Sequence, residues 1–545
     1  MARVFPRRLV DWEGAAGWAW RLAPFFSVKS LMSQYIVIMY VPARRTWHGY
    51  GIGVVRGGMM ANEMAREAQA EHGARHRAID RYCAIEDEFM AGLEATGIAF
   101  AARDEERAER TRLHVALKEA GARIRNGGAS VALGPLSVGC VACTGPCVSR
   151  SFALTNNCHR DCFFCFNPNQ EDFAYWCEHP FPWRRQLDEL AAEPEAPACI
   201  ALTGGEPLLM ADEAVAFFAR AAELFPRAHL RLYTSGDLLT RELIDRLAKA
   251  GLDEIRFSVK QDDEPPMLEK VCERMAWARE VIPTIMVEMP VIPGTEIFME
   301  RLLVRLDGLG VDGVNLLEFA YAMWNWPVFE SLGLTLRNPP RRVLFDYTYA
   351  GALAVQDSEE ACLGLMLWAR QRGLRLSLHY CSLENKHRAQ VRNMNEASAR
   401  IHPCYGFDYD DYFLKTVLAF GADREPVRRA LRAAGCTALR DDPEEQALSF
   451  HPRWIPEVRR ALGSEAALCL STNVIAQRDG VPYLRELKVE PLSSAPLRLD
   501  PVTDEADEGA PCLGGYPATD IFCSISAASS SAEIVCVDTS ASELK

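Results

Sequence analysis

Six cysteines lie close together in the stretch CVACTGPCVSRSFALTNNCHRDCFFC, residues 140–165. The last three, Cys158, Cys162 and Cys165, have the spacing CxxxCxxC and follow a short apolar run that predicts a strand. Three thiolates at this spacing can reach three irons of one [4Fe–4S] cube and leave the fourth iron open. A structural zinc site would need four closed ligands. The spacing therefore favours an iron–sulfur cluster with one open iron.

A glycine-rich turn follows in ALTGGEPLL, and its members are Gly204, Gly205, Glu206 and Pro207. Two glycines let backbone approach a ligand closely, and a carboxylate can accept hydrogen bonds from an ammonium group. Alone, GGEP could be an ordinary turn. Its position directly after the second predicted strand, one strand–helix unit after CxxxCxxC, makes the pair of motifs specific.

Together these motifs resemble the radical S-adenosylmethionine (SAM) superfamily, in which an aromatic residue, here Phe164, precedes the last cysteine. Asn167 and Pro168 follow the last cysteine, and this continuation of the motif resembles that of the pyruvate-formate-lyase-activating branch. The resemblance implies that the open iron binds the amino and carboxylate groups of SAM, and that Phe164 and the GGEP residues contribute to cofactor binding.

Weaker matches to the superfamily occur at later strand ends. Ser235 in LYTSGD, and Ser258 and Lys260 in FSVK, correspond to polar groups that contact the ribose and carboxylate of SAM in that superfamily. VIPGTE is similar to its glycine-containing stretch beside the adenine, although Pro293 departs from the pattern. Ordinary serine capping or a solvated lysine would explain these residues equally well.

The first three cysteines, Cys140, Cys143 and Cys147, cannot extend the SAM site, because a fourth ligand there would block the open iron. A second iron–sulfur centre, a zinc site and a chance cluster of loop cysteines all remain open. GPLSVGCVAC and HYCSLENKHRAQ resemble an uncharacterised group of radical SAM proteins related to the activating enzymes. This resemblance implies an auxiliary iron–sulfur site on the first triplet and Cys381, with Cys404 as the reserve fourth ligand.

Polar residues around Cys381 could meet substrate, namely His379, Lys386, His387 and Gln390. His379 alternates on a predicted strand, so we expect a hydrogen-bonded core or surface histidine. A nearby aromatic run is expected to pack rather than to form a substrate platform. It consists of Trp324, Trp326 and Phe329.

The elements that must position these residues alternate along the chain. Apolar strands are predicted at SFALT, ACIALT, LRLYTS, EIRFSVK, TIMVEMPVI and GVNLLEF, with helices such as DEAVAFFARAAELF and TRELIDRLAKAG between them. Such alternation implies an α/β fold, with parallel strands joined by helices and chemistry at the strand C-terminal ends. With the resemblance, it predicts a partial (β/α)6 barrel, the radical SAM core, over residues 151–320.

Flanking segments complete the predicted organisation. Residues 59–135 read as a helical region, 136–150 as the auxiliary cysteine segment and 321–404 as a core extension with a helix near SEEACLGLMLWARQRG and a strand LRLSLHYC. Residues 405–497 read as a small C-terminal α/β appendage. It has helices near DYFLKTVLAFG and EPVRRALRAAG and a hairpin, LCLSTNVIAQRDGVPYLRELKVEPL.

The two ends differ from the rest of the chain. Residues 1–58 are rich in Trp and Arg, and VRGG precedes Met59 and Met60, which favours one of these methionines as the true start. Residues 1–58 would then be a non-native extension, and finding their peptides in the native protein would contradict this. Residues 498–545 are rich in Ser, Ala and Asp and are predicted to be disordered.

The amino-acid composition argues against several classes of function. Hydrophobic residues make up 49% and charged residues 25% of 545, which is the soluble globular range. The net charge of −14 argues against nucleic acid as the main partner. The apolar run 30–41 is too short to span a bilayer, and no signal peptide is recognisable. Eighteen cysteines point to metal or redox chemistry in a reducing compartment, so we expect a cytoplasmic protein.

The leading functional hypothesis is a radical SAM enzyme. As the resemblance implies, it would cleave SAM reductively to a 5′-deoxyadenosyl radical that abstracts hydrogen from a protein, peptide or small metabolite. An electron donor such as flavodoxin or ferredoxin would be its partner. The alternative is a noncatalytic zinc or iron–sulfur protein that acts structurally or in redox sensing.

Overall fold

The computed structural model describes most of the chain between residues 61 and 497. The described ranges are 61–103, 107–144, 149–170, 172–193, 196–340, 353–395, 403–408, 411–463, 466–478, 481–493 and residue 497. The predictions for residues 1–58 and 498–545 lie outside them. Within these ranges, no helix has the length and apolar character needed to cross a membrane.

A parallel sheet forms the centre of the larger unit, and the six predicted strands are its members. They are β3 (Ser149–Ala153), β4 (Cys199–Thr203), β5 (His229–Thr234), β6 (Glu254–Phe257), β7 (Thr284–Pro290) and β8 (Gly313–Leu317). Each strand pairs in parallel with the next one along the chain. The α/β prediction is therefore confirmed, and the C-terminal ends of all six strands lie on one edge.

The sheet continues beyond the six predicted core strands. The predicted strand LRLSLHYC forms β11 (Ser377–Cys381), which pairs in parallel with β8. β2 (Ser130–Leu133) then pairs antiparallel with β11, and β1 (Arg123–Arg125) pairs with β2. β1 and β2 come from the segment that the sequence assigned to a helical region, and they give a nine-stranded sheet. Without β11, β8 would present an unpaired parallel edge.

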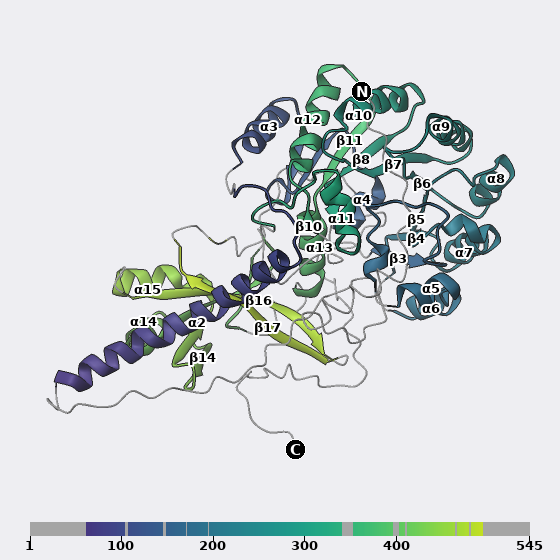
Figure 1. Cartoon of the computed structure of the whole chain (residues 1–545). Coiled ribbons are helices and arrows are strands. Elements are labelled where there is room, and N and C mark those ends of the chain that lie inside the picture. Colours follow the sequence, from purple (N-terminus) through teal and green to yellow (C-terminus); the bar gives the residue numbers. More distant parts are fainter. Residues whose placement is uncertain are drawn as a thin grey trace.

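Helices cover the outer side of the arc of strands (Figure 1). They are α6 (Trp183–Ala191), α7 (Ala211–Leu224), α8 (Arg241–Lys249), α9 (Pro265–Arg279), α10 (Glu296–Gly308) and α12 (Ser358–Gln371). Alternate strand residues such as Leu230 and Leu232 pack with them in one continuous core. The intervening residues, including Arg231, face the other side of the sheet, because successive strand side chains point to opposite faces.

Shorter elements complete the larger unit. They are α3 (Ala108–Glu119), α4 (Val138–Thr144), α5 (Phe173–Glu178), β9 (Ala320–Tyr321), α11 (Trp326–Ser331), β10 (Leu353–Ala354) and α13 (Leu383–Asn395). α4, which carries Cys140 and Cys143, lies on the inner face of the sheet. A Cβ added to Gly139 would lie 2.4 Å from Nη1 of Arg231 and 3.1 Å from Nη2 of Arg256.

Residues 403–493 form a second, smaller unit around an antiparallel sheet. Its strands are β12 (Gly406–Phe407), β13 (Leu414–Phe420), β14 (Leu439–Asp442), β15 (Ala447–Phe450), β16 (Leu468–Arg478) and β17 (Val481–Pro491). The predicted hairpin is confirmed as β16 and β17, and the second predicted helix as α14 (Arg424–Ala433). α15 (Ile455–Leu462) follows β15.

The helix predicted near DYFLKTVLAFG is wrong, because Leu414–Phe420 is β13. Every residue of β13 is buried, and the strand lies between β15 and β16. The last four residues of the strand, Val417–Phe420, are all apolar, and periodicity alone cannot distinguish such a short run in a strand from part of a buried helix.

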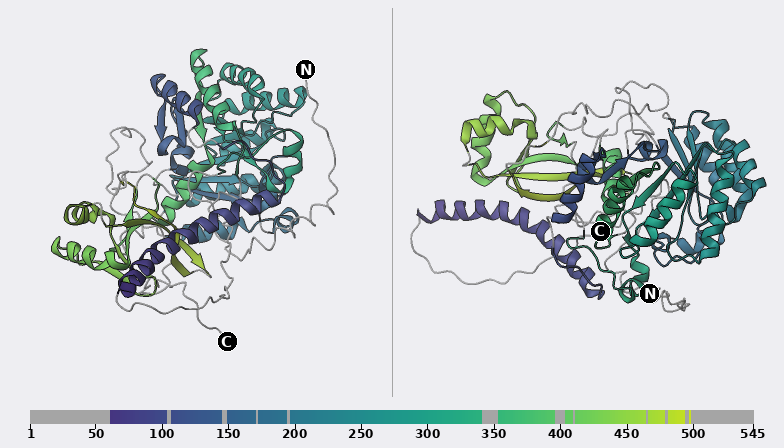
Figure 2. Two further views of the ribbon diagram at one scale, coloured as in Figure 1. Left: turned by 60° about the vertical axis from the view of Figure 1, so that its left-hand side comes forward. Right: turned by 90° about the horizontal axis from the view of Figure 1, so that it is seen from above.

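The long helix α2 (Ala61–Ala95) lies along the smaller unit and extends towards the larger one (Figures 1 and 2). Ala74 and Ala78 pack against the sheet in a cluster that includes Leu418 and Val489. The phenol of Tyr82 donates a hydrogen bond to Oε1 of Glu486 at 2.6 Å. These contacts hold α2 on β13, β16 and β17.

Candidate radical SAM site

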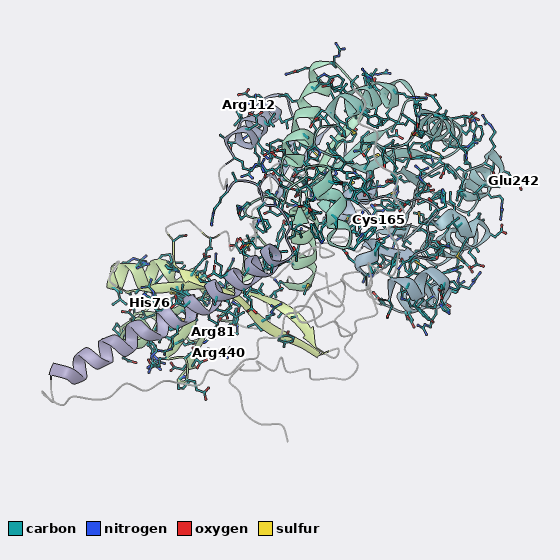
Figure 3. All side chains as sticks on the ribbon, in the orientation of Figure 1. His76, Arg81, Arg112, Cys165, Glu242 and Arg440 are labelled. Atoms are coloured by element: carbon teal, nitrogen blue, oxygen red, sulfur yellow. The ribbon has the colours of Figure 1, made fainter. Side chains whose placement is uncertain are left out.

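The residues after β3 form a loop that carries the second cysteine triplet; we call residues 154–165 the cluster loop. Cys158 is exposed, whereas Cys162 and Cys165 are half-buried, and all three are free thiols. The backbone N–H of Arg160 donates to Sγ of Cys158 at 3.4 Å. In the larger unit, Cys165 lies away from the part of α2 that carries His76 and Arg81 (Figure 3).

Electrostatic interactions show that the three thiols converge. Burial is the main cause that raises the pKa of each thiol, to about 11 for Cys162. The charges of Cys158 and Cys165 also raise the pKa of Cys162, while the ammonium of Lys260 lowers the pKa of all three. Lys260 therefore opposes the effect of burial without reversing it, since the pKa of each thiol stays above its usual value.

No group of three or more His, Cys, Asp or Glu in the described ranges is arranged around a single metal ion. Zinc ligands all meet one ion at about 2.0–2.3 Å. Thiolates that hold a [4Fe–4S] cube bind different irons and lie farther apart. The three thiols of the cluster loop could each bind a different iron of such a cube.

The predicted GGEP turn (residues 204–207) packs directly against the cluster loop. The backbone N–H of Gly205 donates to the carbonyl of Thr155 at 2.9 Å, and that of Glu206 donates to Asn157 at 2.9 Å. A Cβ on Gly205 would lie 2.1 Å from the Asn157 carbonyl oxygen, and Gly204 has a φ of +107°. Only glycines permit this close approach. The structure thus brings the two sequence motifs together.

The carboxylate of Glu206 is buried and fully hydrogen-bonded. Its Oε2 accepts the backbone N–H of Ser235 at 2.8 Å and the Ser235 hydroxyl at 2.6 Å. Its Oε1 accepts the hydroxyl of Thr234 at 2.8 Å and the backbone N–H of Leu208 at 3.1 Å. Pro207, also buried, begins the short 3-10 helix that presents Leu208. Glu206 therefore fastens the GGEP turn to the end of β5.

Asp237, which the sequence analysis did not select, connects this network to the cluster loop. Its carboxylate lies 2.6 Å from the Ser235 hydroxyl and 2.9 Å from Nε2 of His159. Burial would raise the pKa of Asp237, but hydrogen bonds from Ser235 and His159 and the charge of Arg160 hold it below its usual value. The signal in the sequence is a carboxylate two positions after Ser235 and two basic residues inside the CxxxC spacer.

Other predicted SAM contacts lie near the same edge. Lys260 is buried, and its ammonium lies 2.6 Å from the hydroxyl of Ser258. Phe164 packs edge-to-face on Phe163 and Phe319, with ring centroids 5.2 and 5.8 Å apart. Gly294 of VIPGTE has a φ of +86° and an open neighbourhood.

Two residues of the predicted aromatic run pack in the core, and the third contacts the cluster loop. Trp326 and Phe329 belong to the core cluster around Phe319, as predicted. Trp324 is instead partly exposed, and its indole N–H donates to the carbonyl of Cys165 at 2.5 Å. The side-chain amide of Asn325 donates to the carbonyl of Phe163 at 2.9 Å. This segment therefore holds the end of the cluster loop.

Cys140, from the first triplet, is buried among polar side chains on the inner face of the sheet. Nη2 of Arg256 and Nδ2 of Asn315 lie 3.3 and 3.2 Å from its sulfur. Burial would raise the pKa of Cys140, but the charge of Arg256 and a hydrogen bond from His379 lower it to about 6. His379 also contacts Ser130 at 3.0 Å, so its prediction as a satisfied core histidine is confirmed.

The proposed partners of Cys140 differ in their placement. The charges of Cys140 and Cys143 both raise the pKa of Cys381, after the larger effect of burial, so these three thiols interact. Cys147 lies outside the described residues. Cys404 is buried in a core cluster of the smaller unit, with its sulfur 3.5 Å from the carbonyl of Ala438.

Of the polar residues around Cys381, Lys386 is half-buried, and its charge lowers the pKa of Cys381. The side chains of His387 and Gln390 lie outside the described set.

Residues 152–302 match the radical SAM superfamily. A Methanocaldococcus jannaschii protein, named as a candidate glycyl-radical enzyme activating enzyme, is 25% identical over 282 residues, which cover 49% of this chain and 69% of that protein. A PqqA peptide cyclase of Granulibacter bethesdensis is 34% identical over 110 residues, which cover 20% of this chain and 28% of the relative.

Two solved structures also match part of the chain. Streptococcus suis SuiB bound to the precursor peptide SuiA is 15% identical, with a TM-score of 0.32 and coverage of 53% of this chain and 59% of that one. Native anSMEcpe with AdoMet and a peptide is 15% identical, with a TM-score of 0.30 and coverage of 43% and 63%. The family match coincides with the cluster loop, the GGEP turn and strands β4 to β7. Residues 152–302 therefore match a radical SAM domain, and the chain is similar to an enzyme of the activating type.

Proposed function

We propose that this chain is an activating-enzyme-like radical SAM enzyme that cleaves SAM at a [4Fe–4S] cluster held by Cys158, Cys162 and Cys165. The observation that carries the proposal is the direct docking of the GGEP turn on the cluster loop through two backbone hydrogen bonds. A structural metal protein has no use for this second motif beside its thiols. The same two motifs support a site that holds both a cluster and SAM.

The chemistry supplied by the bound cluster and SAM is a one-electron reductive cleavage to methionine and a 5′-deoxyadenosyl radical, which takes a hydrogen atom from substrate to form 5′-deoxyadenosine. The protein's task is to hold the reactants in place. The three thiols supply iron ligands, and Lys260 offsets part of their negative charge. Glu206 keeps the GGEP turn against the loop.

We further propose that SAM lies along the strand ends that carry Ser235, Ser258 and the GGEP turn, with Phe164 beside the cluster. The two glycines expose backbone at the cluster loop, which supports contact with the methionine part of SAM. In this structure the Glu206 carboxylate accepts hydrogen bonds from the backbone of Leu208 and Ser235 and from the Thr234 hydroxyl, and the Ser235 hydroxyl, shared with Asp237, is a fourth donor within reach. This supports a structural task for Glu206, in addition to the contact with the SAM ammonium that the sequence suggested.

A second iron–sulfur centre on Cys140, Cys143, Cys147 and Cys381 is part of the proposal. The effect of the charges of Cys140 and Cys143 on the pKa of Cys381 supports it. Arg231 also supports it, because the residue is 3% exposed and its Nε and Nη1 have no hydrogen-bond partner among the described residues. Burial lowers the pKa of Arg231, and the charges of Tyr233, Cys199 and Cys143 raise it. Buried N–H groups of a cation are costly unless an anion accepts them. A thiolate-bound cluster would supply such an anion.

We propose the substrate and the reductant by chemical class only. The relatives are named for activation of a glycyl-radical enzyme and for cyclisation of a peptide. Their names favour a protein or peptide substrate over a small metabolite. The electron would come from a flavodoxin or ferredoxin, because the cleavage consumes one electron that the chain's own side chains do not supply.

The test is anaerobic reconstitution, followed by iron and sulfide analysis and by electron paramagnetic resonance of the reduced protein with and without SAM. We expect iron and sulfide in equal amounts and a spectrum that changes on addition of SAM. Bound zinc, or a cluster whose spectrum ignores SAM, would favour the alternative of a noncatalytic metal protein. Replacing Cys140 and Cys143 by Ala should lower the iron content and leave the SAM-sensitive signal. Loss of all iron from this folded variant would reject the two-centre proposal.

A further inference from the structure

The spacer between the first two cluster cysteines is held by one buried carboxylate. Nε2 of His159 lies 3.0 and 2.9 Å from the two carboxylate oxygens of Asp237, and Nη1 of Arg160 lies 3.4 Å from one of them. The side chain of Asp237 is 5% exposed, compared with 28% for His159. Both basic residues of the spacer thus converge on the turn after β5.

A second carboxylate extends this contact to the next strand. The guanidinium of Arg160 also pairs with Asp263, in the turn after β6. Arg160 therefore joins the cluster loop to two neighbouring strand ends, and its own backbone N–H donates to the sulfur of Cys158. The same residue therefore contacts the sulfur through its backbone and the two strand ends through its guanidinium.

Asp237 is in turn connected to the GGEP turn through Ser235. The Ser235 hydroxyl lies 2.6 Å from Oδ1 of Asp237 and 2.6 Å from Oε2 of Glu206. A hydroxyl has one hydrogen, so it donates to one of these carboxylates at a time. The Ser235 backbone N–H, which donates to Glu206, keeps the serine in place in either case.

We propose that Asp237 is a positioning residue that fixes the cluster loop, and with it the sulfur of Cys158, relative to the GGEP turn. Asp237 acts through His159 and Arg160. The inference rests on the proposed function, because that function assigns the cluster to this loop. Placement matters here because displacements of about 1 Å are enough to impair a reaction between positioned groups.

The first test uses the full-length, metal-free protein and amide hydrogen exchange. Asp237→Asn removes the negative charge and leaves a side chain of almost the same shape. We expect exchange in residues 157–165 to become about tenfold faster or more, because charge-assisted hydrogen bonds are among the stronger ones. The matched control is Asp212→Asn, whose carboxylate is 88% exposed and pairs with Arg246 on the surface. Unchanged exchange in residues 157–165 of Asp237→Asn would overturn the proposal.

The second test uses the reconstituted protein and a double-mutant cycle on SAM affinity. If Asp237 acts through His159, then Asp237→Asn and His159→Gln should each weaken SAM binding about tenfold, and the double variant should be little worse than either. Fully additive losses would contradict the assignment. The side chain of His159 is partly exposed, so we expect His159→Gln to fold. This variant can therefore be measured even if Asp237→Asn fails to fold.

The two tests separate this inference from the proposed function. Faster exchange in a protein that never binds SAM would support the positioning role and reject the enzyme proposal. If the exchange is unchanged in Asp237→Asn while the wild-type protein forms 5′-deoxyadenosine, the positioning role is rejected and the proposed function stands.

Discussion

The carboxylate of Glu206 binds Ser235 twice, through the serine backbone N–H at 2.8 Å and its hydroxyl at 2.6 Å. With Thr234 and Leu208, four donors lie within 3.1 Å of one buried carboxylate, and the Ser235 hydroxyl, which has one hydrogen, also lies 2.6 Å from Asp237. Glu206 thus joins the ends of β4 and β5 at the point where the cluster loop docks. The sequence predicted Glu206 as a SAM contact and did not predict this second task.

Glu206→Gln should destabilise the metal-free protein. The glutamine amide replaces an acceptor with an N–H₂ group that faces protein donors, and an unsatisfied buried group costs about 1–3 kcal/mol. We expect the free energy of unfolding to fall by about 2 kcal/mol in urea titrations. The control is Glu242→Gln on the surface of α8, labelled in Figure 3, which should change it by less than about 0.5 kcal/mol. Equal losses in both variants would contradict the role of Glu206.

Gly205→Ala should separate the GGEP turn from the cluster loop. The added Cβ would lie 2.1 Å from the backbone oxygen of Asn157, so one of the two segments must move. We expect iron bound after reconstitution to fall at least twofold, together with a loss of SAM binding. Gly364→Ala is the matched control, because its Cβ would meet nothing within 4 Å in helix α12. That variant should keep its iron and gain up to about 1 kcal/mol of stability.

Glu254→Gln should change how stability depends on pH. Burial would raise the pKa of Glu254, but Arg256 and His229 lower it well below its usual range. A carboxylate with a lowered folded-state pKa contributes stability above its unfolded pKa of about 4.3, and this contribution is lost as the pH falls towards the folded value.

At pH 7, Glu254→Gln should be less stable than the wild type by about 3 kcal/mol, because Arg256 loses a buried partner. The difference should shrink below about pH 4.3. Urea titrations of both proteins from pH 7 to pH 3 would measure it. A constant difference over this range would show that ionised Glu254 does not contribute as described.

Tyr82→Phe should loosen α2 from the smaller unit. The Tyr82 phenol donates to Glu486, which also accepts the hydroxyl of Ser471 at 2.5 Å. Loss of one hydrogen bond to a charged group should cost about 1.5–3 kcal/mol. Faster proteolysis within α2 would report the loss, whereas cleavage at the wild-type rate would mean that the apolar contacts of Ala74 and Ala78 suffice.

Sequence spacing predicted the parts of the site that depend on local chemistry. CxxxCxxC and GGEP each need particular residues at fixed separations, and regular alternation of apolar strands and helices placed both at one edge of a parallel sheet. The pairing of Asp237 with His159 was not predictable in this way. It joins residues 78 positions apart, and several carboxylates at strand ends could have filled the same place.

Other features were missed because their signal was ambiguous. Val417–Phe420 is an apolar run too short to distinguish a strand from a helix, and only the pairing with β15 and β16 shows that Leu414–Phe420 is β13. Arg231, Glu254 and Arg256 alternate with apolar residues on predicted strands, and no conclusion was drawn from this alternation at the level of the sequence. The structure shows that the helix of Cys140 and Cys143 covers the face on which Arg231 and Arg256 lie.

The most direct test of the central claim is the formation of 5′-deoxyadenosine by anaerobically reconstituted protein with SAM and dithionite. The account predicts this product from the wild type and from Cys272→Ser, since Cys272 lies on the buried face of α9 and belongs to neither cysteine triplet. It predicts none above background when Cys158, Cys162 and Cys165 are replaced by Ala. Absence of 5′-deoxyadenosine from a wild type with a reduced cluster, or its undiminished formation by the triple variant, would contradict the account.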